Sequence, residues 1–364
     1  MSEKLWYKIV QNFVNAGRIP IRITDNLIEI FKAILTEDQA KFLLAFKKPS
    51  YNIEEFDTDL DKESLTEMLN SLMRAGAISG IPSRRTGVMV YRLLPLLPGI
   101  LETTFMKGET NEKDHKLAVL FQKFFDELVQ STQNNYDLLV SAFKNAPSLA
   151  RIIPVEEVID PKQEVVIPYE ELSKIIEKQD LIGLATCYCR HRKDLLDNPC
   201  KKTDERQNCF SFGRAAEFLI SQGFMNPISA EQAKEILKKA EDDGLVHKAF
   251  HNNLDSEREI EGMCNCCKCC CGTFEMYYTG ASPLNDLTSY LAQVDIDKCV
   301  GCGTCVENCN TEAIDLIETV AAINEDKCIG CGVCAHLCPE NSISLKRTGP
   351  RDVFVLPPKL THSQ

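Results

Sequence analysis

Eight cysteines near the C-terminal end of the sequence form two runs with the same spacing, C-x2-C-x2-C-x3-C. The runs consist of Cys299, Cys302, Cys305 and Cys309 and of Cys328, Cys331, Cys334 and Cys338. The second run follows the first at a constant offset, which also relates Asp297 to Asp326 and Ile314 to Ile343. Self-similarity of this kind indicates a duplicated structural unit and not a chance accumulation of cysteines.

The spacing within each run suits the binding of an iron–sulfur cluster. Thiolates are soft ligands for iron, and three of them at two-residue gaps can surround three corners of a cube. Glycines between the cysteines permit tight turns and leave backbone N–H groups near the cluster. The predicted cofactor-binding glycines are Gly301, Gly303, Gly330 and Gly332. A pair of zinc sites is the alternative, but zinc ribbons pair two C-x2-C knuckles and need no remote fourth cysteine, which favours iron.

The two runs resemble the bacterial two-[4Fe-4S] ferredoxin family, in which the first three cysteines of a run bind one cluster and the fourth binds the other. The resemblance implies two [4Fe-4S] clusters that pass single electrons, in a module whose halves do not fold without iron. The implied ligands are Cys299, Cys302, Cys305 and Cys338 for cluster I and Cys328, Cys331, Cys334 and Cys309 for cluster II. The sequence departs from the family at Asn310, which follows Cys309 where the family has proline; Pro339 keeps that proline in the second run.

Ten further cysteines indicate additional metal binding. All eighteen cysteines lie between Cys187 and Cys338, and clustering of this kind in a reducing compartment is typical of metal ligation and not of disulfides. We expect one or two further iron–sulfur clusters, with the subset of ligands left open. The candidates are Cys187, Cys189, Cys200, Cys209, Cys264, Cys266, Cys267, Cys269, Cys270 and Cys271.

Six of these ten cysteines fall within eight consecutive residues. Because adjacent residues of an extended chain point to opposite faces, we expect the six to serve two sites. The predicted faces carry Cys264, Cys266 and Cys270 on one side and Cys267, Cys269 and Cys271 on the other. A zinc site, a catalytic dithiol or disulfide, and a larger non-cubane cluster remain open as other uses of these residues.

Two sets of polar residues near the cysteines have competing interpretations. A basic segment beside Cys189 either lowers thiolate pKa values through its charge or forms a solvated basic loop; it consists of Arg190, His191, Arg192 and Lys193. His247 and His251 have the i, i+4 spacing of metal ligands on a helix, but the glutamate of a zinc-protease motif is missing. We therefore expect surface histidines.

The pattern of apolar residues predicts an α+β protein of several domains. Helical periodicity at 27–48 and 61–75 is followed by two strand-like pieces at 77–81 and 88–93, and this arrangement resembles a winged-helix module. A longer helical pattern at 113–150 follows. The expected parts are a winged-helix-like domain (1–107), a helical linker (108–150), a cysteine-rich α/β domain (151–285), a two-[4Fe-4S] ferredoxin domain (286–346) and a tail (347–364).

Local signals in the cysteine-rich domain predict three further elements. Pro168 favours the start of a short helix that contains Leu172. Residues 181–186 form an apolar strand that leads to Cys187. Ser229 and Gln232 form a capping-box pair at the start of a helix that Gly244 ends. The region from about 153 to 345 resembles a group of multi-domain iron–sulfur proteins of anaerobes with a C-x-C-R segment, which implies a redox partner.

Composition and charge bound the function. The sequence has no apparent signal or membrane segment, and we expect a cytoplasmic protein without membrane insertion. The net charge of −12 falls entirely on residues 111–364, because residues 1–110 carry 14 basic and 14 acidic side chains. We expect an electron-transfer component of an oxidoreductase, not catalytic alone, that passes single electrons to a flavin or metal oxidoreductase, with docking aided by its acidic charge.

A redox- or iron-sensing winged-helix transcription regulator is the alternative function. Arg84 and Arg85 in the predicted turn between the two strands favour DNA binding. The balanced charge of residues 1–110 disfavours it, because phosphate contacts require a basic excess. Acidic residues also precede the predicted recognition helix, namely Asp57, Asp59, Asp61 and Glu63.

Overall fold

The computed structural model describes residues 2–17, 21–144, 148, 150–159, 171–250 and 260–360. Pro168 and His251, two residues of the sequence predictions, lie outside these ranges. The chain divides into two compact units. Unit 1 comprises Met1–Asp126, Ala185–Pro199 and Glu217–Asn226, and unit 2 comprises Glu127–Leu184, Cys200–Ala216 and Pro227–Gln364.

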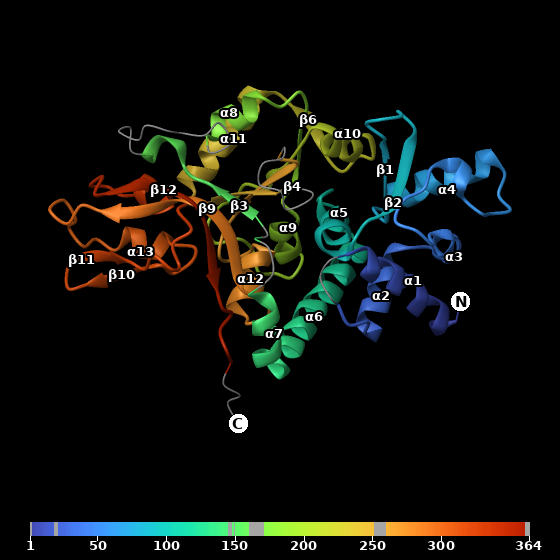
Figure 1. Ribbon diagram of the computed structural model, residues 1–364, viewed down its shortest axis with the longest axis horizontal. Coiled ribbons are helices and arrows are strands. Elements are labelled where there is room, and N and C mark those ends of the chain that lie inside the picture. The colour runs from blue at the N-terminus through green and yellow to red at the C-terminus, as the bar shows by residue number, and fades with distance from the viewer. Residues whose placement is uncertain are drawn as a thin grey trace. The chain divides into compact units, whose positions relative to one another are not determined.

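Unit 1 begins with helices and a hairpin, drawn in blue and cyan in Figure 1. Its first elements are α1 (Glu3–Ala16), α2 (Asp25–Ile34), α3 (Glu37–Phe42), η1 (Leu43–Ala45), η2 (Ile53–Glu55), α4 (Lys62–Arg74), β1 (Ile78–Pro82), β2 (Met89–Leu93), η3 (Leu96–Ile100) and α5 (Leu101–Phe105). Thr36 and Gln39 form a capping box that starts α3, because each side chain satisfies a backbone N–H that the helix leaves unpaired. The apolar faces of α1 and α2 meet at Phe13 and Phe31, whose ring centroids lie 4.7 Å apart.

The predicted hairpin is present, since β1 and β2 pair antiparallel from Ile78↔Leu93 to Pro82↔Met89. The predicted helical pattern at 27–48 corresponds to α2, α3 and η1, and the pattern at 61–75 corresponds to α4. The winged-helix resemblance itself stays a prediction.

The long helical pattern at 113–150 forms α6 (Glu112–Asn134) and α7 (Tyr136–Phe143). Of these two helices, α6 belongs partly to unit 1 and α7 belongs to unit 2. Two later helices belong wholly or partly to unit 1, namely α9 (Tyr188–Asp194) and α10 (Gly213–Ser221). No helix among the described residues is long and apolar enough to cross a membrane.

One sheet organises unit 2. Its eight strands follow the order β12-β9-β3-β7-β8-β5-β4-β6. The strands are β3 (Ala150–Ile153), β4 (Ile182–Thr186), β5 (Gln207–Phe212), β6 (Asn226–Ile228), β7 (Val246–Phe250), β8 (Gly262–Cys266), β9 (Leu284–Val294) and β12 (Ile343–Val355). β3 runs parallel to β9 and antiparallel to β7. The mixture of helices and this sheet agrees with the predicted α+β class.

Successive residues of β3 bury their side chains in different apolar clusters. Ile153 packs in a cluster with residues of α8 (Leu172–Glu177) and α11 (Ala230–Asp242). Ile152 packs in a cluster with Phe274 of α12 (Gly272–Tyr278) and Val333 of α14 (Val333–His336). This separation is the ordinary alternation of a strand, and each large apolar side chain removed from water contributes about 1.5–3 kcal/mol. Cysteines in the second cluster are therefore held in a packed apolar environment.

Most local sequence signals in unit 2 were correct. The predicted strand at 181–186 is β4. Ser229 and Gln232 form the predicted capping box at the start of α11. Gly244 follows α11 with φ of 74°, a left-handed conformation that ends helices and favours glycine. The helix with Leu172 is α8, but it begins at Leu172 after the extended N-cap residue Glu171, so its predicted start at Pro168, which lies outside the described residues, is wrong.

The duplicated segment folds twice into the same arrangement. Two helices, α13 (Thr304–Asn308) and α14, begin after glycines with φ near 80°, Gly303 and Gly332. A strand ends before each helix, at Val294 in β9 and at Ile323 in β11 (Val320–Ile323), and the next strand begins after it, with β10 (Ile314–Ile317) and β12. The constant offset between the two cysteine runs is thus a structural repeat.

We expected a tail from residue 347, but the first part of this segment is a strand. β12 continues to Val355 and pairs with β9 along its length, with a register shift between Arg347 and Arg351. Pairing with β9 satisfies the backbone hydrogen-bonding groups that a free tail would leave to water. The pattern of residues 347–355 contains Gly349 and Pro350, which concealed the strand at the sequence level.

Candidate metal centres

The first candidate centre is a hollow at the start of the duplicated segment. Three of its cysteines come from the first run and one, Cys338, comes from the second. The lining cysteines are Cys299, Cys302, Cys305 and Cys338. Burial raises the pKa of the Cys305 thiol, and the nearby charges of Cys299 and Cys302 raise it further. The ligand set implied for cluster I therefore surrounds one space.

The second candidate centre brings Cys309 to the second run. Burial raises the pKa of Cys331 to about 12, with further contributions from the charges of Cys309 and Cys328. Burial also raises the pKa of Cys334, as do the charges of Cys331, Cys328 and Cys309. Thiolates that oppose one another's ionisation in this way need a cation to be stable together. A cluster of positively charged irons fits that requirement.

The two crossing cysteines accept equivalent backbone hydrogen bonds. The Ala313 N–H donates to Cys309 Sγ at 3.2 Å, and the Ser342 N–H donates to Cys338 Sγ at 3.4 Å. Burial acts to raise the pKa of Cys338, but hydrogen bonds from the Ser342 side chain and backbone outweigh it and lower the pKa. The two donors occupy equivalent positions of the repeat, so each crossing sulfur accepts a backbone hydrogen bond of the same kind.

Sequence reasoning missed an arginine at the second centre. Arg351 of β12 donates to the Cys328 carbonyl and, at 3.3 Å, to the Tyr290 carbonyl. Its charge acts to lower the pKa of Cys328, against a larger opposing effect of burial. Arg351 lies in the segment that was expected to be a tail, and its role depends on a strand pairing that spacing alone does not reveal.

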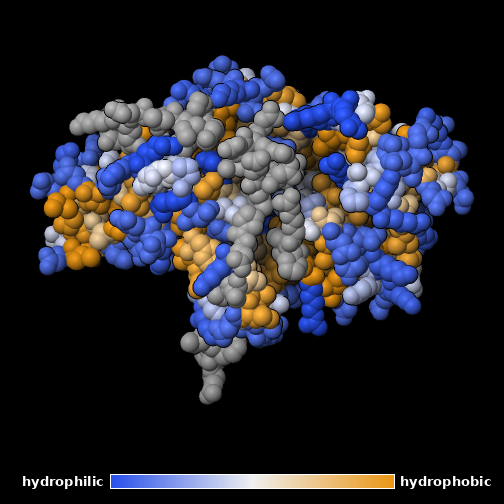
Figure 2. All heavy atoms as spheres, in the orientation of Figure 1, coloured by the Kyte–Doolittle hydropathy of each residue, from blue (hydrophilic) through white to orange (hydrophobic). Residues whose placement is uncertain are grey.

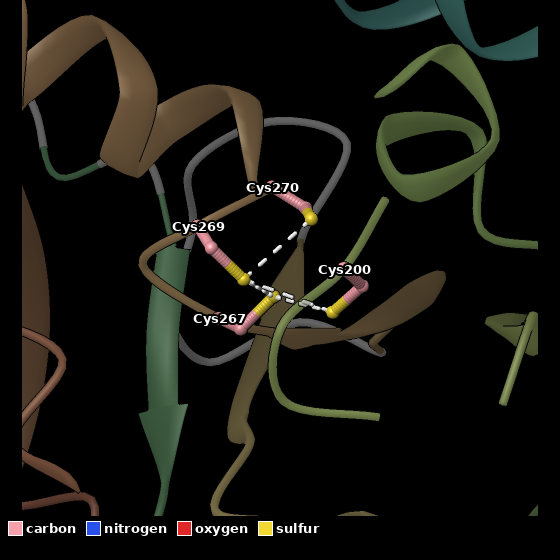
Figure 3. Close-up of side chains that lie close together, drawn as sticks. All are labelled: Cys200, Cys267, Cys269 and Cys270. Carbon is pink, nitrogen blue, oxygen red and sulfur yellow. Dashed lines mark hydrogen bonds between the residues drawn. The ribbon is translucent and has the colours of Figure 1, made fainter. Parts of the chain in front are cut away.

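A third centre is a tight group of four thiols (Figure 3). Cys267, Cys269 and Cys270 come from the loop after β8, and Cys200 comes from the segment after α9. All four sulfurs lie within 4.8 Å of one another. Hydrogen bonds with Cys267, Cys269 and Cys270 lower the pKa of Cys200, and the bond with Cys267 has the largest effect. Hydrogen bonds with the other three thiols raise the pKa of Cys270. The four thiols thus hydrogen-bond to one another, and a bound cation would take the place of the protons in these hydrogen bonds.

The remaining cysteines of the run form a fourth group. Cys266 Sγ and Cys271 Sγ lie 3.3 Å apart, and hydrogen bonds with Cys264 and Cys271 contribute to a raised pKa of Cys266. The buried Lys248 Nζ contacts Asp286 Oδ2 at 2.8 Å. Burial acts to lower the pKa of Lys248, but the charges of Asp286, Cys271 and Cys266 outweigh it and raise the pKa. A buried ammonium at this position would offset the negative charge of these cysteines in their thiolate forms.

The predicted division of the run between two faces is therefore wrong. The run has two groups, but their members are Cys264, Cys266 and Cys271 in one and Cys267, Cys269 and Cys270 in the other. Strand alternation ends at Cys266 because the chain then turns, with the Cys271 N–H donating to the Cys267 carbonyl at 3.0 Å. Cys209 lies opposite Cys264 in the β5–β8 ladder.

The two cysteines of unit 1 lie at the start of a buried helix. Cys187 is the N-cap residue of α9, and Cys189 is buried within the helix. The basic segment is also buried, so the solvated-loop interpretation is wrong. His191 Nε2 lies 2.6 Å from the Glu109 carbonyl, and Arg192 donates to Gln122 at 2.9 Å. These partners give the buried basic side chains a structural role, and the effect of the segment on thiolate pKa values stays a prediction.

The prediction that His247 is a surface histidine is wrong. It lies in β7 and not on a helix, and its exposed fraction is 1%. Its Nδ1 lies 2.5 Å from Asn265 Oδ1, and its Nε2 lies 3.4 Å from Glu241 Oε1. The i, i+4 spacing was misleading because the strand places this side chain in a buried polar network.

Comparison with known proteins identifies the duplicated segment. The model of the 4Fe-4S dicluster domain family matches residues 292–345. The chain therefore carries a C-terminal ferredoxin-like 4Fe-4S module, as the spacing of the two runs predicted. No curated protein and no solved structure matches the chain.

Proposed function

We propose that this protein transfers single electrons between redox partners through two [4Fe-4S] clusters. The observation that supports the proposal is the exchange of cysteines between the runs: Cys338 lines the hollow of the first run, and the charge of Cys309 acts on the thiols of the second. When bound, clusters of this type supply one-electron carriers. Because each run contributes to both quartets, the two carriers are held close together in one module.

The chain contributes thiolates, hydrogen-bond donors and apolar walls. Backbone N–H groups donate to ligand sulfurs, as Ala321 does to Cys299 at 3.5 Å. Such hydrogen bonds stabilise the added negative charge on reduction and raise the reduction potential. Apolar residues packed with the cysteines, including Ile314 and Leu345, exclude water. The residues thereby tune the potential and protect the clusters.

The first centre is the more exposed of the two, and we propose that electrons enter or leave there. Cys302 is exposed, whereas Cys328 and Cys334 are buried. Val300 and Leu316 line the first hollow and are 62% and 41% exposed. Figure 2 shows apolar side chains gathered over β10 and β11, at the left of the view. Apolar surface beside a carrier suits close docking of a redox protein.

The partner that we propose is a flavin or metal oxidoreductase with a basic docking surface. The net charge of −12 lies on residues 111–364, outside the balanced segment 1–110. Complementary charge raises the association rate, and this contribution falls as salt screens it. The regulator remains the second candidate because Arg84 and Arg85 are exposed on the turn between β1 and β2. Gel shifts of the full chain with DNA, at low and high salt, separate the two functions, because only the regulator is expected to bind DNA.

Counting iron and sulfide tests the proposed function. Anaerobically purified protein is expected to contain about eight irons and eight sulfides in the two cubanes. We further propose that Cys264, Cys266 and Cys271 contribute to an additional iron–sulfur site that raises iron above eight. This site is not a cubane, because Cys266 Sγ and Cys271 Sγ lie only 3.3 Å apart. Electron paramagnetic resonance during reductive titration should show magnetic coupling between neighbouring clusters. Cys266→Ala is expected to return the iron content to about eight, whereas colourless protein with zinc in the ferredoxin quartets contradicts the proposal.

Unequal exposure predicts that iron leaves the two ferredoxin centres at different rates. A ferrous chelator should remove the iron bound at the exposed Cys302 centre first and the iron bound by buried Cys328 and Cys334 later. Anaerobic absorbance measurements should show two phases of similar amplitude. The variant Cys302→Ala should lack the fast phase. Release of all ferredoxin iron in one phase would contradict the unequal access of solvent to the two centres.

A further inference from the structure

The spacing of the four thiols in Figure 3 distinguishes one metal ion from a cluster. Cys200 Sγ lies 3.7 Å from both Cys267 Sγ and Cys269 Sγ. Cys269 Sγ lies 3.5 Å from Cys267 Sγ and 3.6 Å from Cys270 Sγ. A zinc–thiolate bond of about 2.3 Å gives a tetrahedron of sulfurs with edges of about 3.8 Å. The four observed distances match edges of this tetrahedron, and the two remaining pairs of sulfurs lie within 4.8 Å, so the group fits a single tetrahedral ion.

A cubane requires a wider set of sulfurs. Each of its thiolates binds a different iron, so two sulfurs are separated by an iron–iron spacing in addition to two iron–sulfur bonds. The ferredoxin quartets of this chain provide the comparison. All eight of their cysteines are described, and no three of their thiols form a group within 4.8 Å. The Cys200 group is thus more compact than the sites matched by the dicluster family.

The surroundings of the group suit a structural metal site. Cys267 and Cys270 pack against the buried side chains of Ala240 and Leu245, which exclude water. Backbone N–H groups of Lys202 and Lys201 donate to Cys200 and Cys269, respectively. Four thiolates around a divalent cation leave a net charge of −2, which N–H donors and neighbouring lysines offset. None of the four positions is left for water or substrate, as in closed structural zinc sites.

We propose that Cys200, Cys267, Cys269 and Cys270 bind one structural zinc ion. The ion joins the segment after α9 to the loop after β8. Both segments contact the ferredoxin module: in the loop after β8 the Lys268 N–H donates to Asn310 Oδ1 at 2.8 Å, and in the segment after α9 Lys202 Nζ donates to Asn308 Oδ1 at 2.6 Å. Because Asn310 follows Cys309, the ion fixes the surface that supports a crossing ligand of the second cubane. This role is separate from electron transfer.

Metal analysis of the full chain tests the proposal. Protein purified anaerobically should contain one zinc per chain, measured by mass spectrometry. Zinc-edge X-ray absorption should show four sulfur neighbours at about 2.3 Å and no neighbouring metal. A single iron in this site, or a metal–metal distance, would overturn the assignment. The absorption measurement requires no variant, so it stands even where a substitution prevents folding.

Matched variants separate this site from the ferredoxin clusters. Cys200→Ala should lose the zinc and retain the ferredoxin iron and sulfide, whereas Cys302→Ala should lose about four irons and retain the zinc. Cys200→His should keep the zinc, because three cysteines and one histidine form an ordinary zinc site. Loss of iron and sulfide together in Cys200→Ala, with no change in zinc, would show that the group belongs to a cluster.

Discussion

Alanine in place of Gly330 is expected to abolish the second cubane site and to remove about half of the ferredoxin iron. Gly330 has φ of +61°, and a Cβ at this position would lie 2.6 Å from the Tyr290 carbonyl carbon and closer still to its oxygen. The left-handed backbone costs a non-glycine residue roughly 1–2 kcal/mol. The clash adds more, because the oxygen belongs to the backbone of β9 and cannot rotate away. Relief requires a shift of the loop that carries Cys328 and Cys331.

Gly303→Ala is the matched control for this effect. Gly303 has φ of +82°, but the nearest atom to its Cβ position is Leu316 Cδ1 at 3.9 Å. Backbone strain of about 1–2 kcal/mol is then the whole cost, and we expect near-normal iron. Iron, sulfide and thermal stability of both variants are the measurements. If Gly330→Ala retains all its iron, the close approach of this loop to β9 is not required for cluster binding.

The sequence predicted those features that depend on neighbouring residues. Ser229 and Gln232 form a capping box within one turn of α11. The cysteine runs predicted the dicluster module because ligand spacing is local within each run, and the repeat made the signal specific. The hairpin of β1 and β2 also followed from apolar segments on either side of a polar turn.

Features that depend on distant contacts were missed or mispredicted. The cysteine run turns after Cys266, so the path of the loop, and not the alternation of side chains along a strand, decides which thiols lie together. His247 was expected at the surface, but β7 and β8 place it against Asn265. Buried polar side chains of this kind keep their hydrogen bonds through partners that periodicity cannot identify.

Asn310 departs from the family pattern, and its side-chain contacts explain the departure. The family has proline after the fourth cysteine, and here the asparagine is buried. Its side chain accepts from the Lys268 N–H at 2.8 Å and donates to the Gly244 carbonyl at 3.1 Å. Proline has no side-chain donor or acceptor, so it could make neither contact. The substitution couples the ferredoxin module to the segments before β7 and after β8, which the sequence alone did not indicate.

Pairs of alanine substitutions are expected to reveal which cysteines share a cluster. Cys302→Ala and Cys309→Ala should each remove about four irons. Together they should remove the iron of both cubanes, because Cys302 lines the first hollow whereas Cys309 faces the second run. The pair Cys302→Ala and Cys338→Ala should remove only about four irons, because both residues line the first hollow. Iron and sulfide per chain are the measurements.

Ligation within each run predicts the reverse order. In that arrangement Cys302 and Cys309 would share one cluster, and their double variant would keep the other, whereas Cys302 and Cys338 would belong to different clusters. The two double variants share Cys302→Ala and each alter one further crossing cysteine, so a general loss of stability affects both alike. A difference between them therefore reports ligand pairing, and equal loss would contradict both arrangements. In the proposed arrangement each run supplies a ligand to the other cluster, so neither half can release its fourth cysteine without exposing iron of the opposite half. The duplicated unit is therefore expected to fold as one module.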